Sequence, residues 1–153
     1  MKAKAIDHIC FAVKDLDAAM ALYRDVLGLE PDGVYTAPSE AIRVARYYLE
    51  NVALELMEPT DPDSDVGRFL QRRGEGFFLI SYRVEDVEEG LKELEAKGYP
   101  LIDREPRELM GNRYAFILPP ARMHGVLTEI LDGEFDYSYE AMGGWRGKAR
   151  DEG

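Results

Sequence analysis

The sequence predicts an α+β fold built from two similar modules, because one order of strand, helix and paired strands occurs twice along the chain. The stretch 6–16 (IDHICFAVKDL) is echoed by 77–87 (FFLISYRVEDV), and Val13 and Val84 are 71 positions apart. The ends of the modules also correspond, LELM at 54–57 against TEIL at 128–131. Each module presents apolar strand faces that need a partner, so we expect the two modules to bury these faces against each other.

The first module is expected over residues 1–73. Residues 6–13 alternate in polarity and are rich in β-formers, which predicts a strand. Asp15 is a favourable N-cap for the following helix, whose apolar residues recur at helical spacing until Gly28 ends it. Two strands over 42–49 and 52–57 follow. Ser64 is expected to cap a short helix that ends near 74–76.

The second module is expected over 74–132 and repeats this order. Residues 77–84 predict a strand, Asp86 caps a helix, and Gly98 ends that helix. Strands over 114–118 and 125–131 are separated by a turn at Pro119 and Pro120.

A third segment, 133–153, is acidic and aromatic and shows no periodicity. It is either a loose tail or an arm that packs its aromatic side chains on the body or on a second subunit. We expect an arm over 135–139 and disorder at the end of the chain.

Composition excludes several classes of function. The formal net charge of −11 argues against nucleic acid and against anionic membranes as partners. No apolar run is long enough to cross a bilayer, and the N-terminus has no apolar signal core. The single cysteine, Cys10, excludes an internal disulfide and fits a reducing compartment, so a cytoplasmic location is expected.

Three side chains form a candidate site. Glu55 and Glu129 lie at matching places in apolar strands, where burying a carboxylate is costly unless it is paired, hydrogen-bonded or bound to a metal. His8 lies on the same face of its strand as Cys10 and Ala12. One imidazole and two carboxylates are a reasonable ligand set for a divalent metal with open positions. The alternative is that each lies on the solvated face of a half-exposed strand.

The motifs resemble the vicinal oxygen chelate superfamily of glyoxalase, bleomycin resistance and dioxygenase proteins. They are the DHI run from Asp7, the YRDVLGL run from Tyr23, the ELMEP run from Glu55, the GEG run from Gly74 and the HGVLTE run from His124. Within the superfamily they look most like methylmalonyl-CoA epimerases, and the resemblance covers about residues 5–132.

This resemblance implies that two βαβββ modules form one cupped mixed sheet with a metal at its centre. The implied ligand positions are His8, Glu55, Leu79 and Glu129, and the metal would be Co, Mn, Mg, Ni or Zn. Epimerases of the family carry histidine at the position of Leu79, so this chain lacks one ligand; position 55 is commonly glutamine. A three-ligand site and the loss of tight metal binding are both open.

The implied activity is an isomerase reaction, epimerisation of a methylmalonyl-CoA-like acyl-CoA. A metal would stabilise the enolate formed beside the thioester, and inversion needs one group to remove the proton and another to return it. Glu129 and Glu40 are the candidate catalytic residues. Phe78, Leu79 and His124 are expected to line the substrate pocket. Members of the family often dimerise, so a homodimer is expected.

Two other functions remain open. The same fold could bind a small molecule without a metal, using the apolar wall at 77–79. Alternatively, the protein is a glyoxalase-type lyase, or a hydrolase, with an altered substrate, because losing a metal ligand often accompanies new chemistry.

Overall fold

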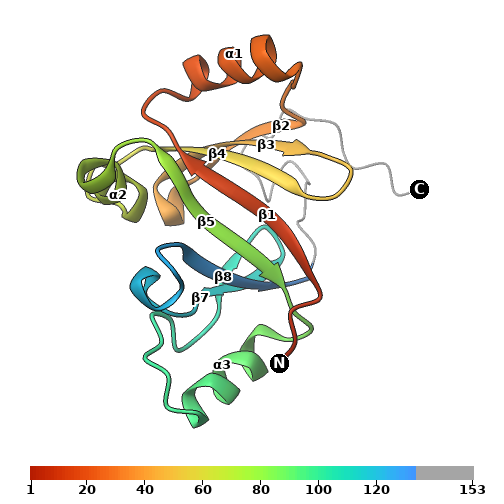
Figure 1. The fold of residues 1–153 in the computed structure, drawn as a ribbon, viewed down its shortest axis with the longest axis vertical. Helices are drawn as coiled ribbons and strands as arrows, with labels where there is room; N and C mark the ends of the chain where they lie inside the picture. The colour runs from red at the N-terminus through yellow and green to blue at the C-terminus, as the bar shows by residue number, and fades with distance from the viewer. Residues whose placement is uncertain (134–153) are drawn as a thin grey trace. The chain divides into compact units, whose positions relative to one another are not determined.

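The structure, a computed structural model, describes residues 1–133, and these confirm the α+β class (Figure 1). Eight strands of the described chain form one mixed sheet in the order β2-β3-β4-β1-β5-β8-β7-β6. The strands are β1 (Ala5–Ala12), β2 (Gly33–Ala37), β3 (Ile42–Tyr48), β4 (Ala53–Pro59), β5 (Gly76–Arg83), β6 (Arg107–Leu109), β7 (Asn112–Phe116) and β8 (Leu127–Asp132). The helices are α1 (Leu16–Leu27), α2 (Asp65–Arg73) and α3 (Val87–Ala96), with 3₁₀ turns η1 (Pro38–Glu40) and η2 (Pro120–Arg122).

The repeat seen in the sequence is visible at the helix starts. The Asp15 side chain accepts a hydrogen bond from the Ala18 backbone N–H at 3.0 Å, and Asp86 accepts the equivalent bond from Glu89 at 3.0 Å. Each bond satisfies a backbone donor that the first helical turn leaves without a partner. Gly28 then ends α1 with φ +68°, a conformation that glycine adopts without strain. The predicted capping residues are therefore confirmed.

The sheet contains two antiparallel three-strand segments, β2-β3-β4 and β6-β7-β8. β5 pairs with β8 in parallel. β2 and the three-residue β6 were not assigned individually from sequence. Both lie at the ends of the strand order, where a short strand has a single neighbour and is stabilised by pairing rather than by its own residue pattern.

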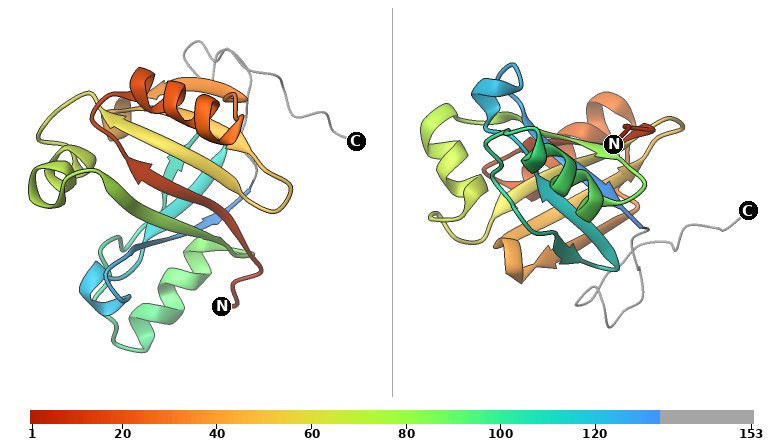
Figure 2. Two further views of the ribbon diagram at one scale, coloured as in Figure 1. Left: turned by 45° about the horizontal axis from the view of Figure 1, so that its top comes forward. Right: turned by 90° about the horizontal axis from the view of Figure 1, so that it is seen from below.

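The described chain divides into two compact units, which we call the β3 unit (Cys10–Phe78) and the β8 unit (residues 1–9 and 79–133). In the β3 unit, α1 packs on β3 and β4 (Figure 2). The core of this unit includes Leu16, Val44, Tyr47 and Leu56, each at most 1% exposed.

In the β8 unit, α3 packs on β7 and β8. Its core cluster comprises Val84, Val87, Leu91, Ala115, Ile117, Leu118 and Ile130. Gly90 allows close packing here, because a Cβ on it would lie 3.4 Å from Ile130 and closer still to the Met1 sulfur. None of the helices in the described part of the chain is both long and apolar enough to cross a bilayer. The aromatic arm predicted over 135–139 lies outside the described residues.

Candidate active site

His8 and Glu129 meet inside the β8 unit. His8 lies on β1 and is 3% exposed, and Glu129 lies on β8 and is 6% exposed. The imidazole Nε2 is 3.4 Å from a Glu129 carboxylate oxygen, while Nδ1 is 2.7 Å from the Asp7 carboxylate. The structure therefore brings together two of the three predicted metal ligands, and it adds a carboxylate behind the imidazole.

Glu55 lies in the β3 unit and has a different environment. It is 1% exposed, and its Oε2 atom is 3.1 Å from the Arg46 guanidinium and accepts a hydrogen bond from the Tyr35 hydroxyl at 3.1 Å. Burial, and next the Glu55 charge, raise the pKa of Tyr35 well above its usual value, so the phenol stays a donor. Arg46 thus compensates the charge of Glu55 inside the core.

Strand register explains why these equivalent carboxylates differ. In the β3–β4 pair Glu55 faces Arg46, whereas in the β7–β8 pair Glu129 faces Phe116. One carboxylate is opposite a guanidinium and the other is opposite a phenyl ring. Arg46 offsets the charge of Glu55, and Phe116 occupies the corresponding position beside Glu129.

The structure places the remaining predicted residues as follows. Leu79 is 2% exposed on β5, two positions before Ser81, which is paired with Glu129 in the sheet. Phe78 is buried, with its ring edge-to-face on Phe69 of α2 at 5.1 Å. His124 is exposed with φ +59°.

Glu40 and Cys10 also have defined surroundings. Glu40 ends the turn η1 and is partly exposed, and the next residue, Ala41, has the left-handed φ of +52°. Cys10 is fully buried and its thiol is 3.7 Å from the Phe11 carbonyl oxygen, which fits a core residue rather than a nucleophile.

Two buried polar residues of the β8 unit, Ser81 beside Glu129 and Asn112 at the start of β7, were missed by sequence reasoning. The Ser81 hydroxyl and the side-chain amide of Asn112 have no hydrogen-bond partner among residues 1–133, although both residues are at most 1% exposed. Leaving such groups unsatisfied costs about 1–3 kcal/mol each unless a ligand or water binds them. The only available signal was a polar residue within each apolar strand, which does not by itself separate a site from a satisfied core.

Whether these residues fit a divalent metal can be judged from the donors. Within residues 1–133 no group of three or more His, Cys, Asp or Glu side chains is arranged as a metal site. The donors in the β8 unit nevertheless suit a metal, because a ligating imidazole commonly donates its other N–H to a carboxylate, as His8 can to Asp7. Glu55 fits less well, since one of its oxygens already binds Arg46 and Tyr35.

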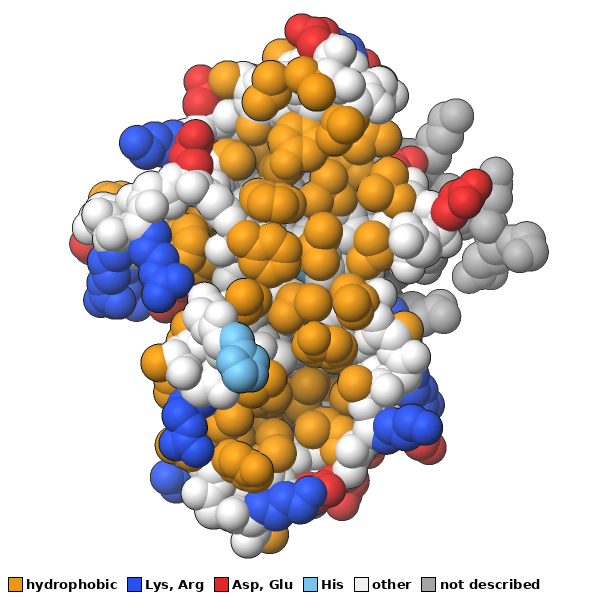
Figure 3. All heavy atoms as spheres, in the orientation of Figure 1, with side chains coloured by type: hydrophobic (Ala, Val, Ile, Leu, Met, Phe, Trp, Pro, Cys, Tyr) orange, Lys and Arg blue, Asp and Glu red, His pale blue; other side chains and the backbone are white. Residues whose placement is uncertain are grey.

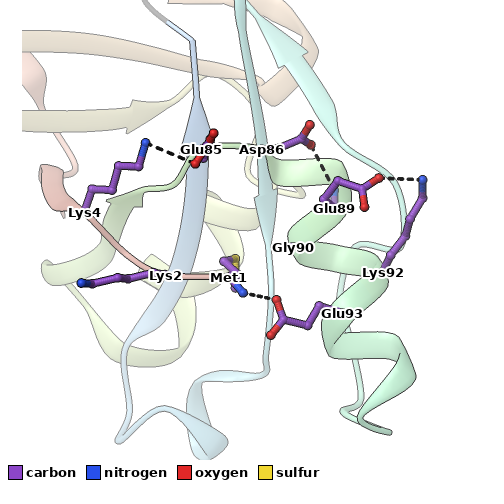
Figure 4. Close-up of a pocket in the computed structure, with 9 residues that line it drawn as sticks. All are labelled: Met1, Lys2, Lys4, Glu85, Asp86, Glu89, Gly90, Lys92 and Glu93. Atoms are coloured by element: carbon purple, nitrogen blue, oxygen red, sulfur yellow. Dashed lines mark hydrogen bonds and ion pairs between the residues drawn. The ribbon is translucent and has the colours of Figure 1, made fainter.

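A surface pocket elsewhere on the β8 unit contains none of the predicted site residues (Figure 4). Its charged lining is of both signs, and Lys92 and Glu89 already pair at 3.0 Å. The lining residues are Met1, Lys2, Lys4, Glu85, Asp86, Glu89, Gly90, Lys92 and Glu93. This pocket therefore does not enter the candidate site.

Apolar side chains also reach the surface. Hydrophobic side chains are visible at the surface in Figure 3. On α1, Leu22, Val26 and Leu27 are 58%, 68% and 61% exposed. The homodimer expected from the sequence stays a prediction.

Two known proteins are similar in sequence to this chain over most of its length. The uncharacterized protein YqjC of Bacillus subtilis is 35% identical over 136 residues, which are 88% of this chain and 96% of the relative. The ethylmalonyl-CoA/methylmalonyl-CoA epimerase of Cereibacter sphaeroides is 30% identical over 127 residues, 82% of this chain and 95% of the relative.

Solved structures agree with these sequence relatives. A variant of the Streptomyces coelicolor methylmalonyl-CoA epimerase in complex with 2-nitronate-propionyl-CoA matches with a TM-score of 0.78 and 34% identity, covering 85% of this chain and 94% of that one. The family model of the Glyoxalase/Bleomycin resistance protein/Dioxygenase superfamily matches residues 7–116. The chain therefore belongs to the Glyoxalase/Bleomycin resistance protein/Dioxygenase superfamily.

Proposed function

We propose that this protein is an epimerase that removes and returns the proton at the α-carbon of a methylmalonyl-CoA-like thioester. The observation that carries the proposal is the pairing of His8 with Glu129 at 3.4 Å inside the β8 unit, with both side chains buried. The epimerases among the relatives support it.

Inverting a carbon requires a group on each face of the reacting centre. In the proposal Glu129 exchanges the proton on one face, since its buried carboxylate can act as a base once substrate has displaced water. The acid predicted from the sequence for the other face is Glu40, at the partly exposed end of η1, and this assignment stays a prediction.

A divalent ion would be held by His8 and Glu129 of the β8 unit. When bound, it would supply Lewis-acid stabilisation of the enolate oxygen. His8 directs Nε2 toward Glu129. The buried residues of the surrounding strands keep water away from the Glu129 carboxylate. Glu55, whose charge Arg46 offsets, keeps the adjoining strands in register.

The test follows deuterium entry at the α-carbon of each methylmalonyl-CoA epimer in D₂O, with Co²⁺ or Mn²⁺ supplied. Glu129→Gln should lower exchange by about 10²–10⁴-fold, because it removes a general base. Glu108→Gln is the control, since Glu108 is an exposed acid on β6. Equal rates for the two variants would contradict the proposal.

Glu40→Gln separates the two faces. If Glu40 serves one face only, this variant should still exchange the proton of the epimer that Glu129 attacks, while conversion to the other epimer is lost. Full retention of epimerisation would remove Glu40 from the mechanism and leave Glu129 in place.

A small-molecule binding protein is the second candidate, favoured by Leu79 and by the compensated charge of Glu55. Calorimetry with methylmalonyl-CoA would then show binding, while deuterium exchange stays at the uncatalysed rate with either metal. The same calorimetric experiment with the substrate of a glyoxalase tests the lyase alternative.

A further inference from the structure

The contact between His8 and Glu129 crosses an intervening strand of the β8 unit. His8 lies on β1 and Glu129 lies on β8, and β5 lies between these two strands in the sheet. Neighbouring strands are about 4.8 Å apart, so the backbones of β1 and β8 are separated by about 10 Å. The two side chains nevertheless approach each other to 3.4 Å. They therefore meet over β5, on the face of the sheet that both occupy.

Ser81 is the β5 residue beside Glu129 on this face. The register of the parallel β5–β8 pair sets Ser81 against Glu129, and residues paired in this way direct their side chains to the same face. The other β5 residues nearest to Ser81 on this face, Leu79 and Arg83, have long side chains. Ser81 is 0% exposed, so its small side chain is completely covered.

We propose that Ser81 is a positioning residue, whose small side chain leaves the space in which the His8 imidazole and the Glu129 carboxylate meet. A larger side chain would fill the volume over β5 and push the carboxylate away from the imidazole, because protein interiors are close-packed and accommodate added methyl groups poorly. The Ser81 hydroxyl has no hydrogen-bond partner among residues 1–133. The position therefore requires a small side chain rather than a hydrogen bond in the free protein.

This role rests on the proposed function, in which the Glu129 carboxylate exchanges the proton. A reacting group that is displaced by about 1 Å can lose about 10²-fold in rate, so the carboxylate needs one fixed place. The His8 imidazole, 3.4 Å away, marks that place. Ser81 has no exposed surface that a substrate could touch, so it acts through Glu129.

Crystal structures of the wild-type protein, Ser81→Ala and Ser81→Val test the proposal through the distance from His8 Nε2 to the nearest Glu129 carboxylate oxygen. We expect a distance close to 3.4 Å in the wild type and in Ser81→Ala, which leaves the space open. In Ser81→Val the distance should increase by about 1 Å or more, because the added bulk lies where the two groups meet. An unchanged distance in Ser81→Val, or an equal increase in Ser81→Ala, would overturn the proposal.

Ala115→Val is the matched control. Ala115 is also 0% exposed in the β8 unit, but it is the register partner of Ile130 in the core cluster, on the face opposite to Glu129. Valine at this position also adds volume to a buried strand, so the melting temperature should fall while the distance from His8 to Glu129 stays the same. An equal increase of that distance in Ala115→Val and Ser81→Val would overturn the proposal, because general overpacking would then explain both.

Circular dichroism establishes that each variant is folded. Should Ser81→Val fail to fold, Ser81→Thr decides in its place, since threonine adds a single methyl group to serine. Deuterium exchange with methylmalonyl-CoA separates this role from the proposed function. We expect Ser81→Val to lower kcat by about 10²-fold with a smaller effect on KM, and Ala115→Val to keep the wild-type kcat. A longer distance with wild-type exchange would support the positioning of the pair and contradict the role proposed for Glu129.

Discussion

Removing Arg46 should destabilise the protein far more than removing another arginine of the same strand. Arg46 and Glu55 are 3.1 Å apart, and their side chains are only 3% and 2% exposed. Arg46→Met keeps much of the side-chain volume but leaves the Glu55 carboxylate buried without its cation. The expected effect is a loss of stability, because a buried charge without a counter-charge is strongly unfavourable.

The size of the loss follows from the geometry. At 3.1 Å and an effective dielectric constant of about 20, the gross attraction is about 5 kcal/mol. Breaking such a buried pair by removing one partner costs about 3–5 kcal/mol. At about 2–4 °C per kcal/mol for a chain of this size, the melting temperature should fall by roughly 6–20 °C.

Urea unfolding followed by circular dichroism measures the difference, with Arg43→Met as the matched control. Arg43 also lies on β3, but its ion pair with Asp17 is exposed, with side chains 35% and 75% accessible. We expect a loss of about 0.2–1 kcal/mol from its ion pair. If the two variants lose similar stability, the pair does not hold the strands as argued.

A compensating variant tests the same reasoning from the other side. Tyr35→Phe/Arg46→Met/Glu55→Leu replaces the whole polar group with apolar side chains. We expect most of the stability lost in Arg46→Met to return, because apolar replacement of a buried ion pair is often neutral or stabilising.

Three further predictions concern separate parts of the molecule. Leu79→His should raise Co²⁺ affinity at least about tenfold, or about 1.4 kcal/mol, by calorimetry, and Leu79→Gln should not; equal affinities would contradict the ligand position assigned to residue 79. Burial raises the pKa of Tyr47 to about 12, so the unfolded chain releases this proton first. The contribution of Tyr47 to the free energy of unfolding is therefore complete below about pH 10 and is lost as pH rises through 12. Tyr47→Phe should flatten this decline of the unfolding free energy with pH, measured by urea unfolding. An unchanged decline would exclude Tyr47 as its source. Gly67→Ala should cost about 1–3 kcal/mol because its Cβ would lie 2.4 Å from the Pro62 carbonyl oxygen. Gly76→Ala, with nothing within 4 Å, should be close to neutral, so equal thermal midpoints for the two variants would contradict the packing argument.

Much of the fold could be predicted because its signals are local. Asp15, Ser64 and Asp86 were identified as caps, and each accepts a bond from the backbone N–H three residues later. The turn at 50–51 lies between β3 and β4, as expected. β2 and β6 were not assigned, since a short strand with one neighbour is stabilised by pairing rather than by its own pattern.

The residues of the candidate site could be predicted from the sequence, whereas their contact partners could not. His8, Glu55 and Glu129 could be singled out because charged groups in apolar strands need a compensating partner. Their partners, Asp7 for His8 and Arg46 for Glu55, lie on other faces or other strands. Sequence spacing alone did not identify those contacts.

The sequence by itself determined the repeated order of elements, the helix ends and the matching positions of Glu55 and Glu129, because capping and periodicity act over a few residues. Only the tertiary structure decided which charges meet. Strand register sets Arg46 opposite Glu55 and Phe116 opposite Glu129, and a slip of one residue would change both partners and faces. The two carboxylates therefore have different partners. Glu55 is offset by the Arg46 guanidinium in the core, and Glu129 lies beside the His8 imidazole.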